Sequence, residues 1–439
     1  MQVSLAKVVS EFKRNWTKVI EQTQIEKTLE ELGVSWRERV LSPANTVELF
    51  LLQILHGNTA INHLRFFSEK TFSASAYCQA RCRLPLELFE ILLKKMSAGL
   101  QRTASECWLG RSVYLVDGSN FSMPDTPLLQ KHFGQPTGQK KGCGFPISHF
   151  VALFHAGTGM IVQVLSGALY SHDLSRFIQL HPALHKKDVI VGDRGFCSFA
   201  HLVLMVGRGV DAVFRINQKQ IVNFKAGRAY SPTKKGLPRS RWERSLGVKD
   251  QLVTWFRPKK PPLWMPERQF NLLPATLLLR ELAYDVHKPG FRTRRVVIVT
   301  TLLDSAQYPA AAIAQLYRQR WSAEINFRHL KTTMGMEVLH CQTVDGVLKE
   351  FYVFCLVYNL VRTLMLETAD TQNCHHTNVS FIDALRWLIA ACYRITHQHV
   401  LILQFRPGRF EPRAVKRRPK QHRLLTKPRN IYKLEPLHA

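Results

Sequence analysis

The apolar residues of this chain follow helical spacing through its first quarter and a shorter, strand-like spacing after it. In the first part, the apolar run at 47–55 repeats at helical intervals, and Asn45 followed by Glu48 resembles a capping box at its start. Two more helices are predicted at 61–67 and 76–84. The first hundred residues are therefore expected to be helical.

The last two of these helices have two interpretations. A short helix, a turn and a second helix that carries Arg81 and Arg83 are typical of a helix-turn-helix that reads DNA. A plain helical bundle with arginines in solvent fits the same pattern equally well. The residues alone do not choose between the two.

From residue 113 the pattern indicates a sheet. Short apolar runs bounded by turn residues predict strands at 113–116, 150–154, 160–165, 189–191 and 212–216. Helices are predicted between the later strands, at 173–184 and 199–206. A meander of three strands followed by alternation with helices predicts a mixed α/β sheet rather than an all-parallel one.

A basic segment then interrupts the sheet pattern. Residues 217–260 hold twelve Lys and Arg against two acids, and strand-like pieces lie at 252–256 and 277–286. We interpret the segment as a basic, β-rich insertion, because a buried strand at 296–303 resumes the earlier pattern. Helices are expected after it at 309–333, 347–367 and 381–396.

Charge changes this picture more than overall composition does. The 439 residues include 61 Lys and Arg against 32 Asp and Glu, which gives a formal net charge of +29. Since 46% of the residues are hydrophobic, there is ample material for a core. The excess of positive charge therefore points to a polyanionic partner such as nucleic acid, with an anionic lipid surface as the alternative.

Neither a secreted nor a membrane protein is indicated. Residues 1–16 lack the apolar centre of a signal peptide, and the most apolar stretch, 351–366, is interrupted by Asn359 and Arg362. The nine cysteines form no CxxC pair, and Cys374-His375-His376 is interpreted as a loop rather than a metal site. We expect a cytoplasmic protein with no membrane partner.

The segment 317–331 carries the most specific pattern. On a helix that turns about 100° per residue, Arg320, Glu324 and Lys331 fall within about 60° of Tyr317. Trp321 flanks this stripe. Taken alone, the stripe favours a solvent-exposed face with an Arg320–Glu324 ion pair.

Two aspartates favour a different interpretation. Asp117 ends the first strand and Asp193 follows the fourth, so that both can converge at one edge of the sheet with Glu324 from a crossing helix. Three gathered carboxylates repel one another unless cations neutralise them. Hard oxygen ligands select Mg²⁺ or Mn²⁺, and two such ions would suit phosphodiester cleavage.

The order Asp117, Asp193, Glu324, with the spacing Tyr317-x2-Arg320-x3-Glu324-x6-Lys331, resembles the bacterial insertion-sequence DDE transposases of the YREK class. The resemblance covers 113–367. It implies an RNase H-like mixed-sheet catalytic core with a β-rich insertion before the glutamate, and the long gap before Glu324 fits that insertion. An N-terminal helical domain and C-terminal helices would complete the fold.

The resemblance also implies roles for the matched residues. Two Mg²⁺ or Mn²⁺ ions would be held by Asp117, Asp193 and Glu324. Phosphates of the transposon end would be contacted by Tyr317, Arg320 and Lys331, with Trp321 packed beside them. Related enzymes stack a flipped base on an aromatic residue of the insertion. Candidates for that role, none of which is assigned, are Trp242, Trp255 and Trp264.

The expected function is cut-and-paste transposition. The protein would bind double-stranded DNA at the terminal inverted repeats, cleave it there and join the 3′-hydroxyl ends to target DNA. A homodimer in a synaptic complex, associated with the bacterial nucleoid, is the expected working form. Two alternatives stay open: a metal-dependent nuclease on the same scaffold, and a catalytically idle, transposase-derived DNA-binding protein.

These expectations divide the chain into five regions. The predicted regions are a helical N-terminal DNA-binding domain (1–105), the first part of the core (106–216), the basic insertion (217–293), the second part of the core with the YREK helix (294–370), and a C-terminal helical region with a basic tail for DNA binding or dimerisation (371–439).

The tail yields a first prediction. Residues 405–439 hold eleven Lys and Arg against two Glu, and each phosphate contact steepens the log–log salt dependence of DNA binding by roughly 0.9. Deletion of the tail should therefore flatten that dependence, measured by fluorescence anisotropy, while metal-dependent cleavage persists. Loss of cleavage together with the tail would make its charge part of the active complex.

Overall fold

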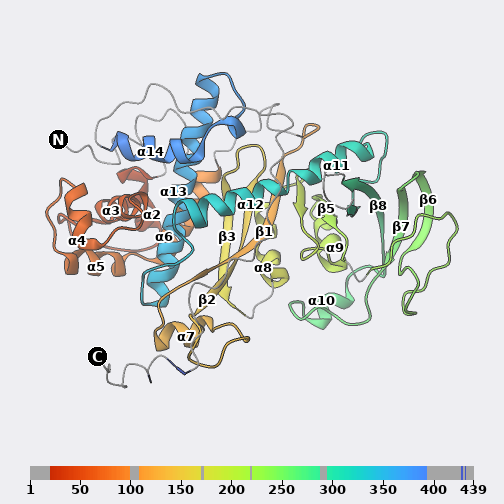
Figure 1. Ribbon diagram of the computed structural model, residues 1–439, viewed down its shortest axis with the longest axis horizontal. Coiled ribbons are helices and arrows are strands. Elements are labelled where there is room, and N and C mark those ends of the chain that lie inside the picture. Colours follow the sequence, from red (N-terminus) through yellow and green to blue (C-terminus); the bar gives the residue numbers. More distant parts are fainter. Residues whose placement is uncertain are drawn as a thin grey trace.

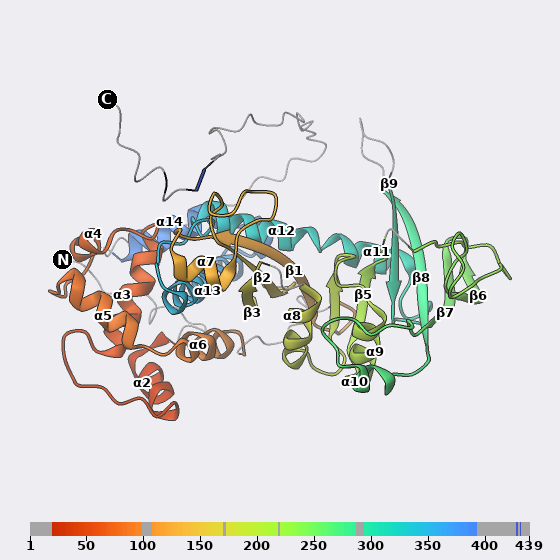
Figure 2. The ribbon, with the colours of Figure 1, turned by 90° about the horizontal axis from the view of Figure 1, so that it is seen from below.

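The fold is elongated, with an all-helical region at one end of a long sheet that further helices cover. The computed structural model describes residues 20–98, 108–169, 173–217, 220–286, 294–392, 427–428 and 431. The N-terminal helices lie at one end of the long axis and the strands of the basic insertion at the other (Figures 1 and 2). Most of the basic tail and the end of the helix expected at 381–396 lie outside the described residues.

Five strands form the predicted core. They are β1 (Val113–Ser122), β2 (Ile147–His155), β3 (Ile161–Ala168), β4 (Val189–Gly192) and β5 (Asp211–Arg215). β1 pairs antiparallel with β2 and parallel with β4, β2 pairs antiparallel with β3, and β4 pairs parallel with β5. The resulting mixed order, β3-β2-β1-β4-β5, confirms the RNase H-like α/β class expected from the sequence.

The strands of the insertion extend this same sheet. They are β6 (Arg241–Gly247), β7 (Asp250–Phe256) and β8 (Thr276–Val286), followed by β9 (Arg294–Thr300). β9 pairs antiparallel with β5, and β8, β7 and β6 follow in that order, so that the described strands form one nine-stranded sheet. Backbone hydrogen bonds therefore join the insertion directly to the core.

Buried polar pairs hold the insertion strands together. Arg280 is fully buried and donates to both carboxylate oxygens of Asp250, at 2.8 and 2.5 Å. Trp255 donates its indole N–H to Glu281 at 2.9 Å, and burial raises the pKa of Glu281. Since a buried charge without a partner is costly, these pairs make the interior of the insertion dependent on its strand register.

The N-terminal helices bear out the helical prediction, with one correction. They are α2 (Gln22–Glu31), α3 (Pro43–Leu55), α4 (Ile61–Leu64), a 3-10 turn η2 (Arg65–Phe67), α5 (Ala74–Arg83) and α6 (Leu86–Ala98). The cap of α3 is Ser42, whose Oγ accepts from the backbone N–H of Asn45 at 3.3 Å, so the capping box at Asn45 was wrong. Pro43, favoured in a first helical turn, places the start there, while Glu48 pairs with Lys70 instead.

Arg81 is packed inside the molecule. Its guanidinium lies 3.8 Å above the ring of Phe50 and donates to Gln53 Oε1 at 3.1 Å and to Cys341 Sγ at 2.8 Å. These contacts join α5 to α3 and to a loop far along the chain. Arg81 is thus not available to read bases, whereas Arg83 on the same helix is exposed.

The remaining helices cover the sheet and connect its strands. They are α7 (Pro127–Phe133), α8 (Asp173–Leu180), the 3-10 turn η3 (His181–Ala183), α9 (Phe199–Gly207), α10 (Glu267–Asn271), α11 (Ala310–Arg318), α12 (Trp321–Arg328), the π-helical turn η4 (His329–Thr333), α13 (Val344–Thr371), the 3-10 turn η5 (His376–Asn378) and α14 (Phe381–Ala391). The single helix expected at 309–333 was wrong, because the chain breaks at Gln319 and Arg320 and changes to π geometry at His329.

The long helix α13 explains the apolar stretch at 351–366. It is buried along most of its length, and Asn359 pairs with both the N–H and the carbonyl of Ile161 on β3, each at 2.8 Å. Arg362 donates to the carbonyl of Thr158 in the β2–β3 turn. The two polar residues that interrupt the stretch therefore anchor α13 to the sheet. Within the described residues, no helix is both long and apolar enough to span a bilayer.

Glu350 on α13 provides a test of how the helical domain is attached. Its buried carboxylate accepts from Asn58 Nδ2 at 2.6 Å and from the backbone N–H groups of His340 and Cys341, both at 2.8 Å. Glu350→Ala should lower the free energy of unfolding by roughly 3 kcal/mol, because the buried Asn58 amide and two partly buried backbone N–H groups lose their acceptor. Urea unfolding followed by circular dichroism measures it.

The matched control is Glu30→Ala, which removes an exposed carboxylate from α2 and should change the unfolding free energy by less than about 0.5 kcal/mol. Equal effects of the two substitutions would show that the Glu350 contacts do not attach the domain.

Candidate active site

One pocket gathers the acids singled out in the sequence. It has a volume of about 460 Å³ and lies where α12 crosses β1 (Figure 1). Its walls come from β1, the loop after β4, α12 and η4. The lining residues are Asp117, Gly118, Ser119, Asp193, Arg320, Glu324, Phe327, Arg328, Lys331, Thr332 and Glu337. Three carboxylates that lie far apart in sequence therefore face one space.

Strand register brings the two aspartates together. β1 and β4 are parallel, with Val116 opposite Gly192, so the next residue on each strand is an aspartate. A Cβ on Gly192 would lie 2.8 Å from the Val116 side chain and 3.0 Å from Phe214. Only glycine fits there without displacing a neighbour, and the close approach of the two strands depends on it.

Asp117 is the most strongly perturbed of the acids. Burial raises its pKa to about 6, and the nearby charges of Glu324 and Asp193 act in the same direction. The backbone N–H of Gly118, which donates to Asp117 Oδ1 at 2.9 Å, and the guanidinium of Arg320 oppose that increase. Burial therefore outweighs the hydrogen bond and the positive charge that favour the ionised form of Asp117.

Arg320 is the cation at the centre of this arrangement. Its Nη2 lies 2.8 Å from Glu324 Oε1 and its Nη1 lies 3.6 Å from Asp117 Oδ2, while its side chain is only 10% exposed. The Arg320–Glu324 pair expected from the sequence is present. Only its Glu324 half is open to solvent, at 45% exposed, because the Arg320 side chain is buried and also reaches Asp117 on the sheet.

The donor set fits a divalent metal ion in chemistry. Carboxylate oxygens are hard ligands of the kind that Mg²⁺ and Mn²⁺ prefer, and they already converge on one positive group. Among the residues that the structure describes, no three His, Cys, Asp or Glu side chains are grouped tightly enough to hold a metal ion. In the structure, Arg320 supplies the positive charge nearest to both Asp117 and Glu324.

The other residues of the predicted stripe fall into different environments. Lys331 lines the pocket, and its Nζ donates to Asn120 Oδ1 at 3.3 Å. Tyr317 is 5% exposed and does not line the pocket, and burial raises its pKa. Trp321 is 59% exposed beside the pocket, with the Arg320 guanidinium 5.1 Å from its ring centre. The break before α12 separates Tyr317 from the remaining members.

Sequence reasoning missed several lining residues. Arg328 lies eleven positions after Tyr317, about 20° from it on an ideal helix, so the same stepping that selected Lys331 could have found it. Glu337 comes from the segment after η4, which returns to β1 through the hydrogen bond from Ser122 N–H to the Glu337 carbonyl, 3.0 Å long. No sequence pattern indicated that return.

The three tryptophans of the insertion differ in packing. Trp255 is 8% exposed and bonded to Glu281. Trp264 stacks on His201, with ring centres 4.3 Å apart, and Trp242 is partly buried. Trp255 and Trp264 thus already have packing partners. Cys374, His375 and His376 lie in a turn and the start of η5, as expected for a loop.

The raised pKa of Asp117 predicts a stability effect with a definite pH dependence. A carboxyl whose pKa is higher in the folded than in the unfolded protein destabilises the fold once the pH rises above its unfolded pKa. The full loss of stability is reached above about pH 6. Asp117→Asn should therefore raise the melting temperature by a few degrees at pH 8. The gain should shrink as pH falls from 6 towards 4.

Differential scanning fluorimetry across this pH range measures the effect. Asp304→Asn, at an exposed aspartate outside the pocket, is the control and should leave the melting temperature unchanged. A lower melting temperature for Asp117→Asn at pH 8 would show that the ion pair with Arg320 outweighs the cost of burial.

Comparison with known proteins places this geometry in a family. A family model described as "Transposase DDE domain" matches residues 108–360. The transposase InsG for insertion sequence element IS4 of Escherichia coli K12 is 23% identical over 304 residues, which cover 67% of this chain and 62% of InsG. The putative transposase InsZ of the same strain is 28% identical over 95 residues, or 21% of this chain and 32% of InsZ.

This chain therefore spans less than two thirds of the length of these relatives. Among solved structures, the piggyBac transposase in a synaptic complex with hairpin DNA matches with a TM-score of 0.43 and 9% identity, over 89% of this chain and 79% of that one. A likeness at that level carries no argument here. The family model covers more than half of the chain, from the start of the core through most of α13. The chain belongs to the DDE transposase-domain family.

Proposed function

We propose that the protein is a transposase of a bacterial insertion sequence that cleaves DNA at the ends of its element and joins the 3′-hydroxyl ends to target DNA. The observation that carries the proposal is the meeting of Asp117, Asp193 and Glu324 at one pocket in a chain of this family. The net charge of +29 supports DNA as the substrate.

The family implies the use of divalent metal ions in general. We propose Mg²⁺ or Mn²⁺, two ions, held by Asp117, Asp193 and Glu324. When bound, such ions activate the attacking oxygen and stabilise the leaving oxygen of a phosphodiester. The lining of one pocket by all three carboxylates supports this ligand assignment.

The basic residues of the pocket would position the DNA. Arg328 and Lys331 line it, and a phosphate that enters meets both cations near the carboxylates. Phosphoryl transfer depends mainly on positioning and on charge neutralisation. Arg320 would contribute its charge in two ways, by holding Glu324 and Asp117 in the free protein and by contacting transposon-end phosphate during the reaction.

Buried Tyr317 would support this end of α11, while exposed Trp321 would pack beside the DNA. We also propose a homodimer in a synaptic complex that acts on chromosomal DNA in the bacterial cytoplasm. The helical N-terminal domain, the basic insertion and the C-terminal region would supply further DNA contacts or dimer contacts.

The central test is Asp193→Ala. The variant should lose metal-dependent cleavage of a duplex that carries an element end, by at least about a thousandfold, because a proposed metal ligand is gone. Its binding of the same duplex should stay close to that of the unmodified protein. Glu267→Ala removes an exposed acid of α10 outside the pocket and should cleave normally. Normal strand joining by Asp193→Ala would refute the assignment.

A second test separates transposition from simple nuclease action. Duplexes with pre-cleaved 3′ ends, incubated with plasmid DNA and Mg²⁺, should become joined to the plasmid, and EDTA should abolish the reaction. Hydrolysis without joining would indicate the nuclease instead. Binding without metal-dependent cleavage would indicate a DNA-binding descendant of a transposase.

A further inference from the structure

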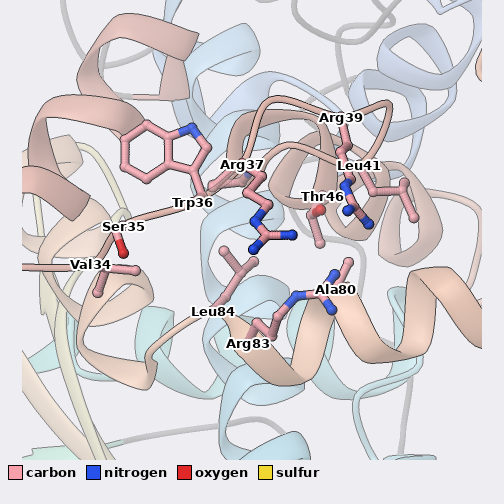
Figure 3. A pocket seen from close by; sticks show the side chains of 11 residues that line it. Val34, Ser35, Trp36, Arg37, Arg39, Leu41, Thr46, Ala80, Arg83 and Leu84 are labelled. Atoms are coloured by element: carbon pink, nitrogen blue, oxygen red, sulfur yellow. The ribbon is translucent and has the colours of Figure 1, made fainter.

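The N-terminal domain contains a second cavity, separate from the candidate active site. It has a volume of about 420 Å³ and lies between the extended segment after α2, the start of α3 and the last turns of α5 (Figure 3). No residue is shared between the linings of the two pockets. A cavity of this size falls within the range of ligand sites and far exceeds the space of a single water molecule.

Three arginines surround this cavity. Arg37 and Arg39 come from the segment between α2 and α3, and Arg83 comes from the end of α5. Figure 3 shows the three guanidinium groups turned towards the same space. All three residues are exposed, and no acidic residue lines the cavity.

These arginines contrast with their neighbour Arg81, whose guanidinium is held by Gln53, Cys341 and the ring of Phe50. Within the described part of the chain, no ion pair or side-chain hydrogen bond satisfies Arg37, Arg39 or Arg83. Three like charges around one space raise the free energy of the unliganded protein. A bound anion would remove that cost.

The floor of the cavity is apolar and rigid. Thr46 is 1% exposed, and Ala80 and Leu84 are each 4% exposed. The indole ring of Trp36 forms one wall, fixed by the hydrogen bond from its Nε1 to Glu38 Oε1 at 2.9 Å. An anion that also carries an apolar part, such as a sugar joined to phosphate, matches this combination of floor and rim.

We infer that this cavity binds the sugar–phosphate backbone of double-stranded DNA. Arg37, Arg39 and Arg83 would donate to phosphate oxygens, which suit the planar guanidinium fork, and deoxyribose would pack over Leu84 and Ala80. The inference rests on the proposed function for its choice of DNA as the anion, but it requires no catalysis. It assigns the N-terminal domain a backbone grip in place of base reading by Arg81.

The test is the salt dependence of DNA binding by the full chain. A random-sequence duplex of thirty base pairs, labelled with fluorescein, is suitable because backbone binding is independent of sequence. The triple variant Arg37→Gln, Arg39→Gln, Arg83→Gln should flatten the log–log slope by roughly 2.7, about 0.9 per contact. Affinity at 0.1 M salt should fall by about two orders of magnitude as a result.

A charge-matched control uses three exposed cations near β4. Lys186 and Lys187 precede this strand, and Arg208 follows it in the chain. The variant Lys186→Gln, Lys187→Gln, Arg208→Gln removes the same formal charge outside both pockets. Its slope should change by less than half as much. Equal slopes for the two triple variants would overturn the inference and leave the proposed function intact.

One further arm completes the experiment. In it, the melting temperatures of the unmodified protein and of the Arg37/Arg39/Arg83 variant are compared in millimolar inorganic phosphate. If phosphate raises only that of the unmodified protein, while both proteins bind the duplex with the same affinity, the cavity is a small-anion site. That result would overturn the DNA assignment. Absence of any DNA binding by the unmodified protein would overturn both the cavity's ligand and the proposed function.

Discussion

The burial of Asp117 is the constraint on which the site depends, because it raises the pKa of that carboxyl and the nearby charges of Glu324 and Asp193 act in the same direction. Asp117, Asp193 and Glu324 share one pocket although like charges raise the free energy of such a cluster. Arg320 relieves part of that cost by bridging Asp117 and Glu324. Arg320 lies directly before the first residue of α12, so its pair with Glu324 spans the first turn of that helix.

Contacts in the surrounding core hold the elements that carry the carboxylates in place. Phe327, one turn beyond Glu324, packs edge-on against Phe150 and Phe154 of β2, with ring centres 5.3 and 5.2 Å apart. Aromatic packing of this kind fixes α12 on the sheet. At the other end of the site, Glu337 closes onto Ser122 through the backbone. A charged cluster is therefore held together by apolar contacts on one side and main-chain hydrogen bonds on the other.

Local patterns predicted much of this arrangement and long-range pairing supplied the rest. The place of Asp193 just after β4 was readable because it follows a short apolar run, whereas the expectation that Asp117 ends the first strand was wrong, since β1 continues past it to Ser122. The helix break at Gln319 was not readable, since neither proline nor glycine marks it. The burial of Arg81 depends on Cys341, which lies 260 positions away, and the joining of β9 to β5 depends on a pairing that no single run reveals. Pro43 did mark the true start of α3, but Asn45 and Glu48 resembled a better-known cap.

The unbroken sheet has a consequence for the distance between the basic insertion and the carboxylates. Backbone pairing runs without interruption from β4 through β5, β9, β8 and β7 to β6, and neighbouring strands lie about 4.8 Å apart. The outer edge of the insertion is therefore held at roughly 24 Å from the aspartate-bearing strand, the length of about seven base pairs of duplex at 3.4 Å each. Because hydrogen bonds fix the strand spacing, the sheet also fixes the distance between the basic edge and the carboxylates.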